Sequence, residues 1–346
     1  MLPQGTIWQE LRRRALDTVQ PGCAVGYSLP PTLEKWLQAG AFNVSTVTKR
    51  GFTLEAASVE IGSALLSEAF YSADYALEHS VSLRNQIACN RWSSPAWTAV
   101  TFYYWGYHLA VAMTRLLGRA VWFISPELTP QLKSLAGAGM PSHGSGPYVV
   151  ECGTPLSATV REIKLMRSSQ TRAHDAVWQV WFSELRKCAA TTLARKPSSL
   201  EARLHVSLIG AANVLGDTWP SDLRNAVNYT IKSGYGAVRG EHTVAVHSAV
   251  RVDPPSTVAE MINRLEGNAA SLVPKLSITD QLPIATRTLI DTTFAMEILL
   301  QELLDEITQR RGIDRRWTNT RVKFARVHAE RFGVRSWPCR EDDAVD

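Results

Sequence analysis

The chain has 346 residues, of which 45% are hydrophobic and 20% are charged, and its formal net charge is +5. This composition is typical of a folded globular protein and excludes an intrinsically disordered chain. The length is sufficient for two domains. The mild basicity is compatible with a nucleic-acid partner without requiring one.

Five scattered cysteines have no metal-type spacing between any two of them; they are Cys23, Cys89, Cys152, Cys188 and Cys339. This use of cysteine predicts a reduced protein with structural thiols and no metal site. Residues 1–14 carry charges where a signal peptide needs an apolar core, so we expect a cytoplasmic protein. The sequence holds no cofactor fingerprint, and we expect no cofactor.

The first 50 residues contain two short amphipathic patterns, separated by Pro21-Gly22 and Pro30-Pro31. They predict a separate N-terminal helical segment. From residue 54 to residue 77, small and apolar side chains recur at steps of three and four residues. This spacing predicts one long helix.

The next predicted helix covers residues 96–117, with Pro95 in its first turn and Gly118 as its C-terminal cap. Residues 92–114 contain no Asp, Glu, Lys or Arg, and this stretch is long enough to span a bilayer. It also holds many hydroxyl groups, whose burial in lipid is unfavourable. We therefore expect a buried helix and no membrane partner.

Residues 125–150 are rich in Pro, Gly and Ser, which predicts a loop, and alternation within residues 148–165 predicts a small β hairpin. A strand or an extended link is expected at residues 242–252. Further helices are predicted at residues 173–194, 199–215, 258–272 and 284–309.

These patterns predict a mainly α protein, an antiparallel helical bundle with a minor β hairpin. We expect three regions. Residues 1–50 form the N-terminal helical segment, residues 51–310 the main helical region, and residues 311–346 a basic C-terminal tail.

An Arg-Asn step occurs twice in an apolar frame, at Arg84-Asn85 and at Arg224-Asn225. The second step continues to Tyr229, which gives the pattern Arg-Asn-x-x-x-Tyr. The first has Cys89 at the corresponding position. For the second step, a phosphate or RNA contact competes with helix capping and an internal salt bridge, while for the first we expect a structural role.

The order of elements adds to this pattern. An Ala-rich helix over 54–77 precedes an aromatic helix over 96–117, and a short His-Gly loop follows at Met140–Gly144. Together with Trp219-Pro220 and the Arg-Asn step, this order resembles YaaC-like proteins of the HEPN superfamily. The resemblance covers roughly residues 54–310.

The resemblance implies a helical domain that dimerises and cleaves RNA without a metal. In that group an Arg holds phosphate and a His moves the proton of the ribose 2′-hydroxyl. Arg224 and Asn225 match the first two positions, and Tyr229 stands where the His is expected. A tyrosine with a pKa near ~10 is a poor general base, so whether the chain is an enzyme stays open.

Other candidate motifs favour structural roles. Loop packing is favoured for His143-Gly144-Ser145-Gly146, which lacks the Lys ending of a phosphate loop. His242 and His247 fall on opposite faces of an alternating segment, a poor metal clamp. His174-Asp175 is interpreted as a pair in the first turn of a helix, not as a catalytic pair.

The C-terminal tail is strongly basic and interleaved with aromatic residues such as Trp317 and Phe324. Arginines with aromatics favour a nucleic-acid surface, although a solvated basic face or an acidic protein partner fits the same composition. The predicted nucleic-acid-binding residues are Arg315, Arg316, Arg321, Lys323, Arg326 and Arg331.

The sequence therefore predicts a HEPN-like cytosolic protein that acts on or near RNA, as the resemblance implies, in a prokaryotic defence or stress system. Its expected partners are RNA rather than DNA, and a protein partner or a second copy of the chain. The alternative is a non-catalytic interaction subunit of a multi-protein complex, in which the Arg-Asn-Tyr site is only structural.

Overall fold

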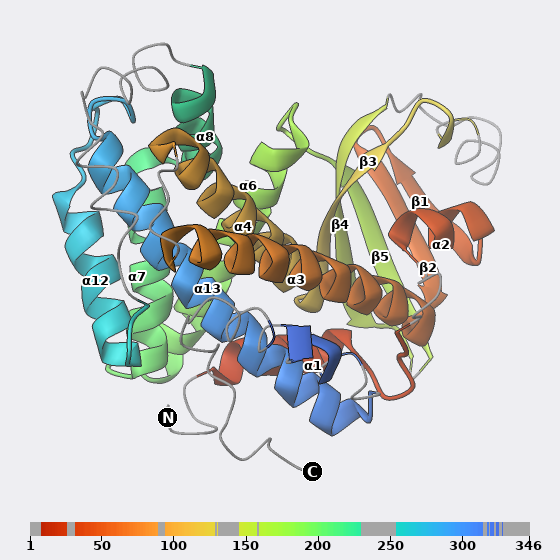
Figure 1. Ribbon diagram of the computed structural model, residues 1–346. Coiled ribbons are helices and arrows are strands. Elements are labelled where there is room, and N and C mark those ends of the chain that lie inside the picture. Colours follow the sequence, from red (N-terminus) through yellow and green to blue (C-terminus); the bar gives the residue numbers. More distant parts are fainter. Residues whose placement is uncertain are drawn as a thin grey trace.

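The computed structural model describes residues 8–25, 32–88, 94–128, 130, 145–157, 159–229 and 254–313, and a few residues between 317 and 327. Long helices form one side of the molecule and a twisted sheet forms the other, with α3 and α4 running between the two sides (Figure 1). The described helices are α1 (Gln9–Thr18), α2 (Leu33–Ala39), α3 (Ser58–Ala88), α4 (Pro95–Leu116), α6 (Ala173–Arg195), α7 (Leu200–Leu215), α8 (Trp219–Tyr229), α12 (Val258–Ser271) and α13 (Leu282–Arg311).

The sheet has five strands, all antiparallel to their neighbours, in the order β1-β2-β5-β4-β3. The predicted hairpin is present as β4 and β5. It belongs to a five-stranded sheet, however, so the prediction of only a minor hairpin was wrong in extent. The strands are β1 (Phe42–Thr48), β2 (Gly51–Ala57), β3 (Arg119–Ile124), β4 (Gly146–Pro155) and β5 (Val160–Arg167).

Strands β1 and β2 were not predicted, and each has a physical reason. β1 is an edge strand with mostly exposed side chains, so it has no apolar alternation to detect. In β2, Leu54 pairs with Ile163 and is fully buried, yet its spacing also fits the helix that follows. The long helix consequently begins at Ser58 instead of Leu54, and it continues to Ala88. The turn at residues 49–50 joins two paired strands, so the expected boundary after residue 50 falls inside one hairpin.

One face of the sheet packs on α2 and on the first turns of α3 through Trp36, Ile61 and Leu65. A larger core joins the helices, and its most buried side chains include Trp105, Trp178 and Trp181. Helices α3 and α4 contact each other extensively, and the small side chains of α3 permit this close approach. A larger residue at Gly106 would collide with Thr293, since a Cβ there would lie 2.8 Å from its Oγ1. The α4–α13 approach therefore depends on this glycine.

The predicted ends of α4 are confirmed: Pro95 is its first residue, and Gly118 follows with a φ of +75°, which favours glycine. The other long helices begin and end close to the predicted residues, with Ser199 capping α7 and Thr257 capping α12. None of the described helices combines the length and the apolar character that crossing a membrane requires.

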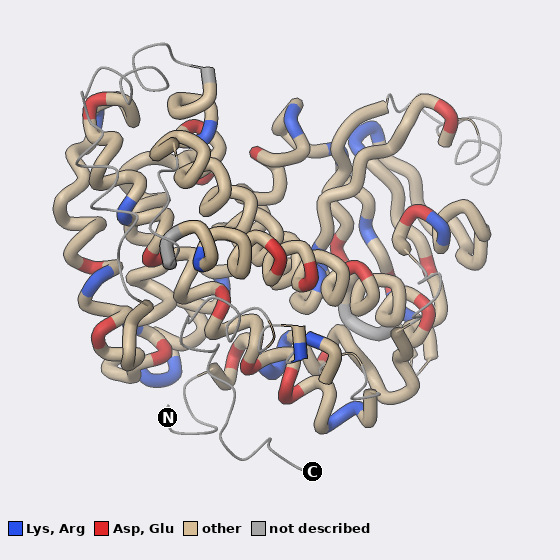
Figure 2. Tube along the Cα trace, in the orientation of Figure 1, with Lys and Arg blue, Asp and Glu red and all other residues tan. Residues whose placement is uncertain are grey.

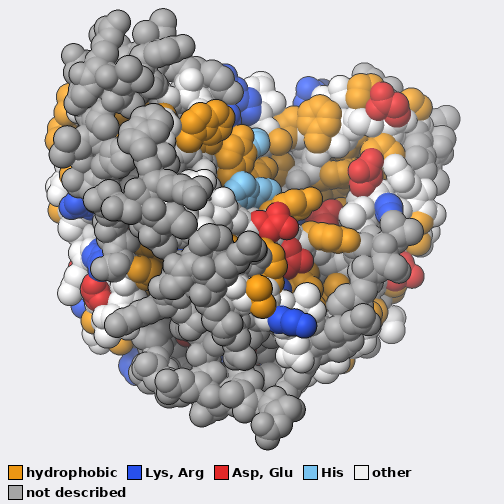
Figure 3. Space-filling model, viewed as in Figure 1, with side chains coloured by type: hydrophobic (Ala, Val, Ile, Leu, Met, Phe, Trp, Pro, Cys, Tyr) orange, Lys and Arg blue, Asp and Glu red, His pale blue; other side chains and the backbone are white. Residues whose placement is uncertain are grey.

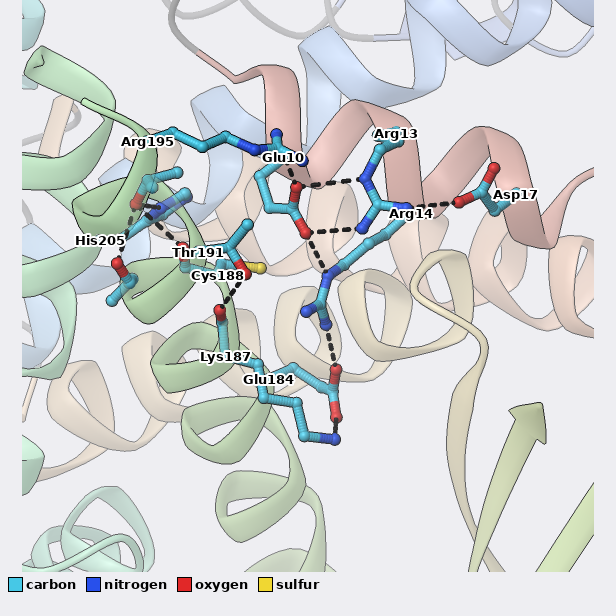
Figure 4. A network of polar contacts seen from close by, with 12 residues as sticks. Glu10, Arg13, Arg14, Asp17, Glu184, Lys187, Cys188, Thr191, Arg195 and His205 are labelled. Carbon is cyan, nitrogen blue, oxygen red and sulfur yellow. Dashed lines mark hydrogen bonds and ion pairs between the residues drawn. The ribbon is translucent and has the colours of Figure 1, made fainter. Parts of the chain in front are cut away.

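Charged side chains fasten α1 to α6 and α7 (Figure 4). Arg14 bridges two carboxylates, Glu10 at 2.9 Å and Glu184 at 2.8 Å. Glu184 also pairs with Arg119 and Lys187. Both carboxylates are almost fully buried, with side-chain exposures of 1% and 3%. We refer to Glu10, Arg13, Arg14, Glu184 and Lys187 as the α1 network.

Candidate functional site

A hollow opens between the helical side of the molecule and the sheet, and histidine side chains line its floor (Figure 3). Hydrophobic side chains and carboxylates surround these histidines in the same view. Among the described residues, three histidines are half-buried: His79 on α3, His108 on α4 and His174 on α6. The fourth, His205, is fully buried and lies away from this surface. The hollow therefore gathers histidines from three separate helices.

The first feature of the site is a stack of rings around His174. Tyr107 stacks on His174 with ring centroids 4.2 Å apart and an interplanar angle of 11°. Tyr103 lies 5.9 Å from the same ring, nearly parallel to it, and its hydroxyl is 2.8 Å from His174 Nδ1. The Tyr103 hydroxyl also lies 3.2 Å from the buried Ser221 hydroxyl. These contacts hold the imidazole in one orientation.

The second feature is Arg224, which projects from α8 over the ring of Tyr103, with its Cζ 5.3 Å from the ring centroid. Its Nε is buried and has no hydrogen-bond partner. Within the part of the chain that the structure describes, no carboxylate pairs with this guanidinium. Arg224 is therefore a half-buried cation held by an aromatic ring and not neutralised by an acid.

The other Arg-Asn step is different. Arg84 pairs with the buried Glu297 at 3.1 Å and lies over the ring of Trp105. This agrees with the structural role expected for Arg84. The two steps look alike in sequence, but only Arg224 lacks a carboxylate partner among the described residues.

Electrostatics at the floor of the hollow favour neutral imidazoles. Burial lowers the pKa of His174, and the positive charge of Arg224 lowers it further. Burial and the neighbouring histidines lower the pKa of His108 to about 4. Burial also raises the pKa of Tyr103 to about 12, so its hydroxyl keeps its proton at neutral pH. A neutral imidazole has a lone pair that can accept a proton, and a bound anion would raise its lowered pKa back toward the ordinary value.

A second stack of rings runs across α3 and α4. Tyr75 stacks on His108 at 5.2 Å, His108 on His79 at 5.5 Å, and His79 on Tyr104 at 6.0 Å, with interplanar angles between 14° and 29°. Tyr104 in turn meets Tyr103 edge to face at 5.3 Å. We call Tyr75, His108, His79 and Tyr104 the ring ladder. It extends from the exposed side of α3 to Tyr103, the ring over which Arg224 lies.

The structure places the other predicted residues as follows. Asn225 is half-buried on α8 next to Arg224. Tyr229 is the last residue of α8, and its side chain lies outside the described residues. Among the tail residues, Arg315, Arg316, Arg326 and Arg331 lie outside the described residues, as do His143, His242 and His247. Their predicted roles stay predictions.

Two predicted tail residues are described. Arg321 lies over the ring of Trp317 at 4.3 Å, pairs with Asp74 at 3.5 Å and donates to the Ala73 carbonyl at 2.9 Å. Burial lowers the pKa of this guanidinium to about 10. Lys323 is exposed. Arg321 is therefore engaged with α3 and with Trp317, whereas Lys323 is exposed.

Sequence reasoning missed the histidines of the hollow. His174 was interpreted as a first-turn helix pair, and His79 and His108 were not singled out. A local signal existed: Tyr75 and His79 are four residues apart on α3, and Tyr104 and His108 have the same spacing on α4. The convergence of the two helices with α6 is a tertiary property that this spacing does not contain.

Among the described residues, no group of three or more His, Cys, Asp or Glu side chains is arranged to hold a metal ion. Comparison with protein-family models, with curated proteins and with solved structures gives no match for this chain. The resemblance to the HEPN superfamily consequently rests on the sequence motifs alone.

Proposed function

We propose that the hollow binds RNA and that the chain cleaves its phosphodiester bond without a metal. Arg224 is the phosphate ligand, and His174 transfers the proton of the ribose 2′-hydroxyl. The observation that carries the proposal is the half-buried guanidinium of Arg224, whose Nε has no hydrogen-bond partner. A buried donor without a partner is costly, and a phosphate oxygen is the kind of acceptor that a guanidinium fork fits.

The neighbouring imidazole supplies the chemistry that Tyr229 cannot. When Nδ1 of His174 donates to the Tyr103 hydroxyl, Nε2 is left with a lone pair and can accept a proton. In the other tautomer Nε2 carries a proton and can donate it. His174 is therefore the proposed replacement for the histidine missing from the Arg-Asn-x-x-x-Tyr pattern, supplied by α6 instead of α8.

The proposed reaction balances without any co-reactant. His174 removes the proton from a ribose 2′-hydroxyl, and the 2′-oxygen attacks the adjacent phosphorus. The bond from phosphorus to the 5′-oxygen breaks, that oxygen takes a proton from water, and the His174 imidazolium returns its proton to the solvent. The products are a 2′,3′-cyclic phosphate and a 5′-hydroxyl. Arg224 neutralises charge that develops on the non-bridging oxygens.

The test is cleavage of a labelled single-stranded RNA by purified protein in the presence of EDTA, with a DNA of the same sequence as the control that lacks the 2′-hydroxyl. We expect cleavage of the RNA alone, with cyclic-phosphate ends. His174→Gln and Arg224→Met should each lower the rate by a factor on the order of 100 or more. Arg186→Ala is the matched control, because that arginine pairs with Asp217 outside the hollow. Unchanged cleavage by both hollow variants would overturn the proposal.

A second candidate function is that of a non-catalytic subunit that binds RNA through the same hollow. The observation that favours it is Tyr229, which stands in the position of the catalytic histidine. The same assay distinguishes the two candidates. RNA binding that depends on Arg224 but yields no cleaved product would support the second and exclude the first. A role in defence or stress rests on the sequence resemblance.

A further inference from the structure

The ring ladder ends in an open aromatic face. Tyr75 is the outermost ring, and 53% of the residue is exposed although one side of its ring stacks on His108. The inner rings pack between α3 and α4, whereas the ring of Tyr75 lies at the exposed end. An exposed aromatic face next to a phosphate site is the arrangement on which nucleobases stack.

A carboxylate lies beside this face. Glu78 follows Tyr75 by three residues on α3, which places the two side chains next to each other. Glu78 is exposed, and its charge raises the pKa of His79 against the larger, opposite effect of burial. Figure 3 shows acidic side chains directly beside the histidines of the hollow. A carboxylate repels phosphate but accepts hydrogen bonds from the amino groups of bases.

The ladder is continuous with the phosphate site. Tyr104 stacks on His79 and also contacts Tyr103, the ring beneath Arg224. A single strand lying in the hollow can therefore bring one phosphate to Arg224 and one base to the outer end of the ladder.

We propose that the ring ladder is a nucleobase subsite for single-stranded RNA. A base stacks on the open face of Tyr75, and Glu78 accepts a hydrogen bond from the exocyclic amino group of that base. This inference rests on the proposed function, because it deepens the same site. It assigns a preference for bases that carry an amino group over uracil, which carries none.

The test measures binding of 2′-O-methyl oligoadenylate and oligouridylate, which the proposed reaction cannot cleave, by fluorescence anisotropy. We expect tighter binding of oligoadenylate. Tyr75→Ala should weaken it by a factor of about 5 to 50, the loss of one stacked base, and Tyr75→Phe should restore it. Tyr71→Ala is the matched control, since Tyr71 lies one turn earlier on α3 and is 44% exposed. We expect this control to change affinity by less than about twofold.

A second variant tests the hydrogen bond. Glu78→Gln should reduce the preference for oligoadenylate over oligouridylate. Equal affinities of wild type, Tyr75→Ala and Tyr71→Ala, with binding lost in Arg224→Met, would overturn the base subsite and leave the phosphate site standing. Binding that Arg224→Met does not change would instead count against the proposed function. Absence of binding by the wild type would overturn both.

Discussion

Two regions of this molecule hold buried cations in opposite ways. In the α1 network, Arg14 lies between Glu10 and Glu184, and each carboxylate receives several donors. In the hollow, Arg224 rests on an aromatic ring, and its Nε has no acceptor. The α1 network thus pairs Arg14 with two carboxylates, whereas Arg224 has none among the described residues where the surface opens. The difference separates charges that hold the fold from a charge that, under the proposed function, is kept for a ligand.

The distribution of charge along the chain follows the same division. Arg115 is the only charged residue of α4, although this helix supplies most rings of the hollow. Basic and acidic residues are scattered over the other elements, and α1 carries several of both signs (Figure 2). The part of the hollow that α4 contributes is therefore built from rings and an imidazole, and the carboxylates beside it come from other elements.

The largest effect is expected in the α1 network. Glu184→Ala removes a shared carboxylate from Arg14, Arg119 and Lys187 at once, and leaves Arg14 with Glu10 alone and Arg119 with Glu151 alone. We expect a loss of about 3–5 kcal/mol in the free energy of unfolding, measured by chemical denaturation. Asp217→Ala is the control, since its pair with Arg186 is more exposed and should cost less than about 1 kcal/mol. Similar losses for the two variants would contradict the structural role of the network.

The next effect concerns the first Arg-Asn step. Arg84→Met leaves the buried carboxyl of Glu297 without its cation. Burial already raises the pKa of Glu297 to about 7, against the lowering influence of Arg84, and removing Arg84 raises it further. We expect a loss of roughly 2–4 kcal/mol.

This loss should depend on pH. A carboxyl with a raised pKa contributes stability below its ordinary value and loses it as the pH rises through the folded value. The cost of Arg84→Met should therefore be larger above about pH 7 than below it. Denaturation on both sides of that pH checks the sign, and a cost that does not vary with pH would speak against a buried, titrating Glu297.

Two buried or half-buried histidines should make stability depend on pH. Burial lowers the pKa of His205 to about 4 from an ordinary value of 6.5, so the unfolded chain takes up the proton first. Stability should fall as the pH drops from 6.5 toward 4, by an amount on the order of 2–3 kcal/mol for this residue. His205→Gln should flatten the profile. His108→Gln should flatten it as well, because its pKa is also about 4.

Bound RNA should affect the protonation of His108 and His205 differently. A phosphate in the hollow should favour the protonated forms of His174 and His108, whereas His205 is fully buried and out of its reach. Histidine titration by NMR with and without 2′-O-methyl RNA should therefore move the resonances of the hollow alone. A shift confined to His205 would contradict the placement of the site.

The sequence predicted the helices well and the sheet poorly, for a physical reason. Long amphipathic helices repeat their pattern over many turns, so α6, α7, α12 and α13 end close to the predicted residues. Strand β3 follows α4 directly after Gly118, and β1 has few buried side chains. Their pairing is a long-range property, and short apolar runs do not specify it.

The candidate site shows the same limit: local sequence patterns do not reveal contacts that form only in the folded chain. Arg224 was detectable because a motif is a local pattern, whereas His174 joins it only through tertiary packing. The helix that carries His174 packs against α4 through Trp178, which is fully buried. The ring centroids of Trp178 and Tyr103 are 6.2 Å apart. In the proposed site the imidazole comes from α6 and not from the motif position at Tyr229, so the motif alone does not reveal it.

The smallest effect on stability is expected at Arg224. The sign of the change in the free energy of unfolding distinguishes it from an arginine that supports the fold. Arg224→Met keeps an unbranched stem over Tyr103 and removes the buried Nε that has no acceptor. A structural arginine, such as Arg84, would cost several kcal/mol when replaced in this way. A residue retained for a ligand should cost nothing, and its replacement should raise the free energy of unfolding by up to about 1 kcal/mol. The measurement is chemical denaturation of Arg224→Met beside Arg84→Met, together with RNA affinity. A loss of stability as large as that of Arg84→Met would mean that the guanidinium of Arg224 supports the fold, and the phosphate site would then have to be abandoned.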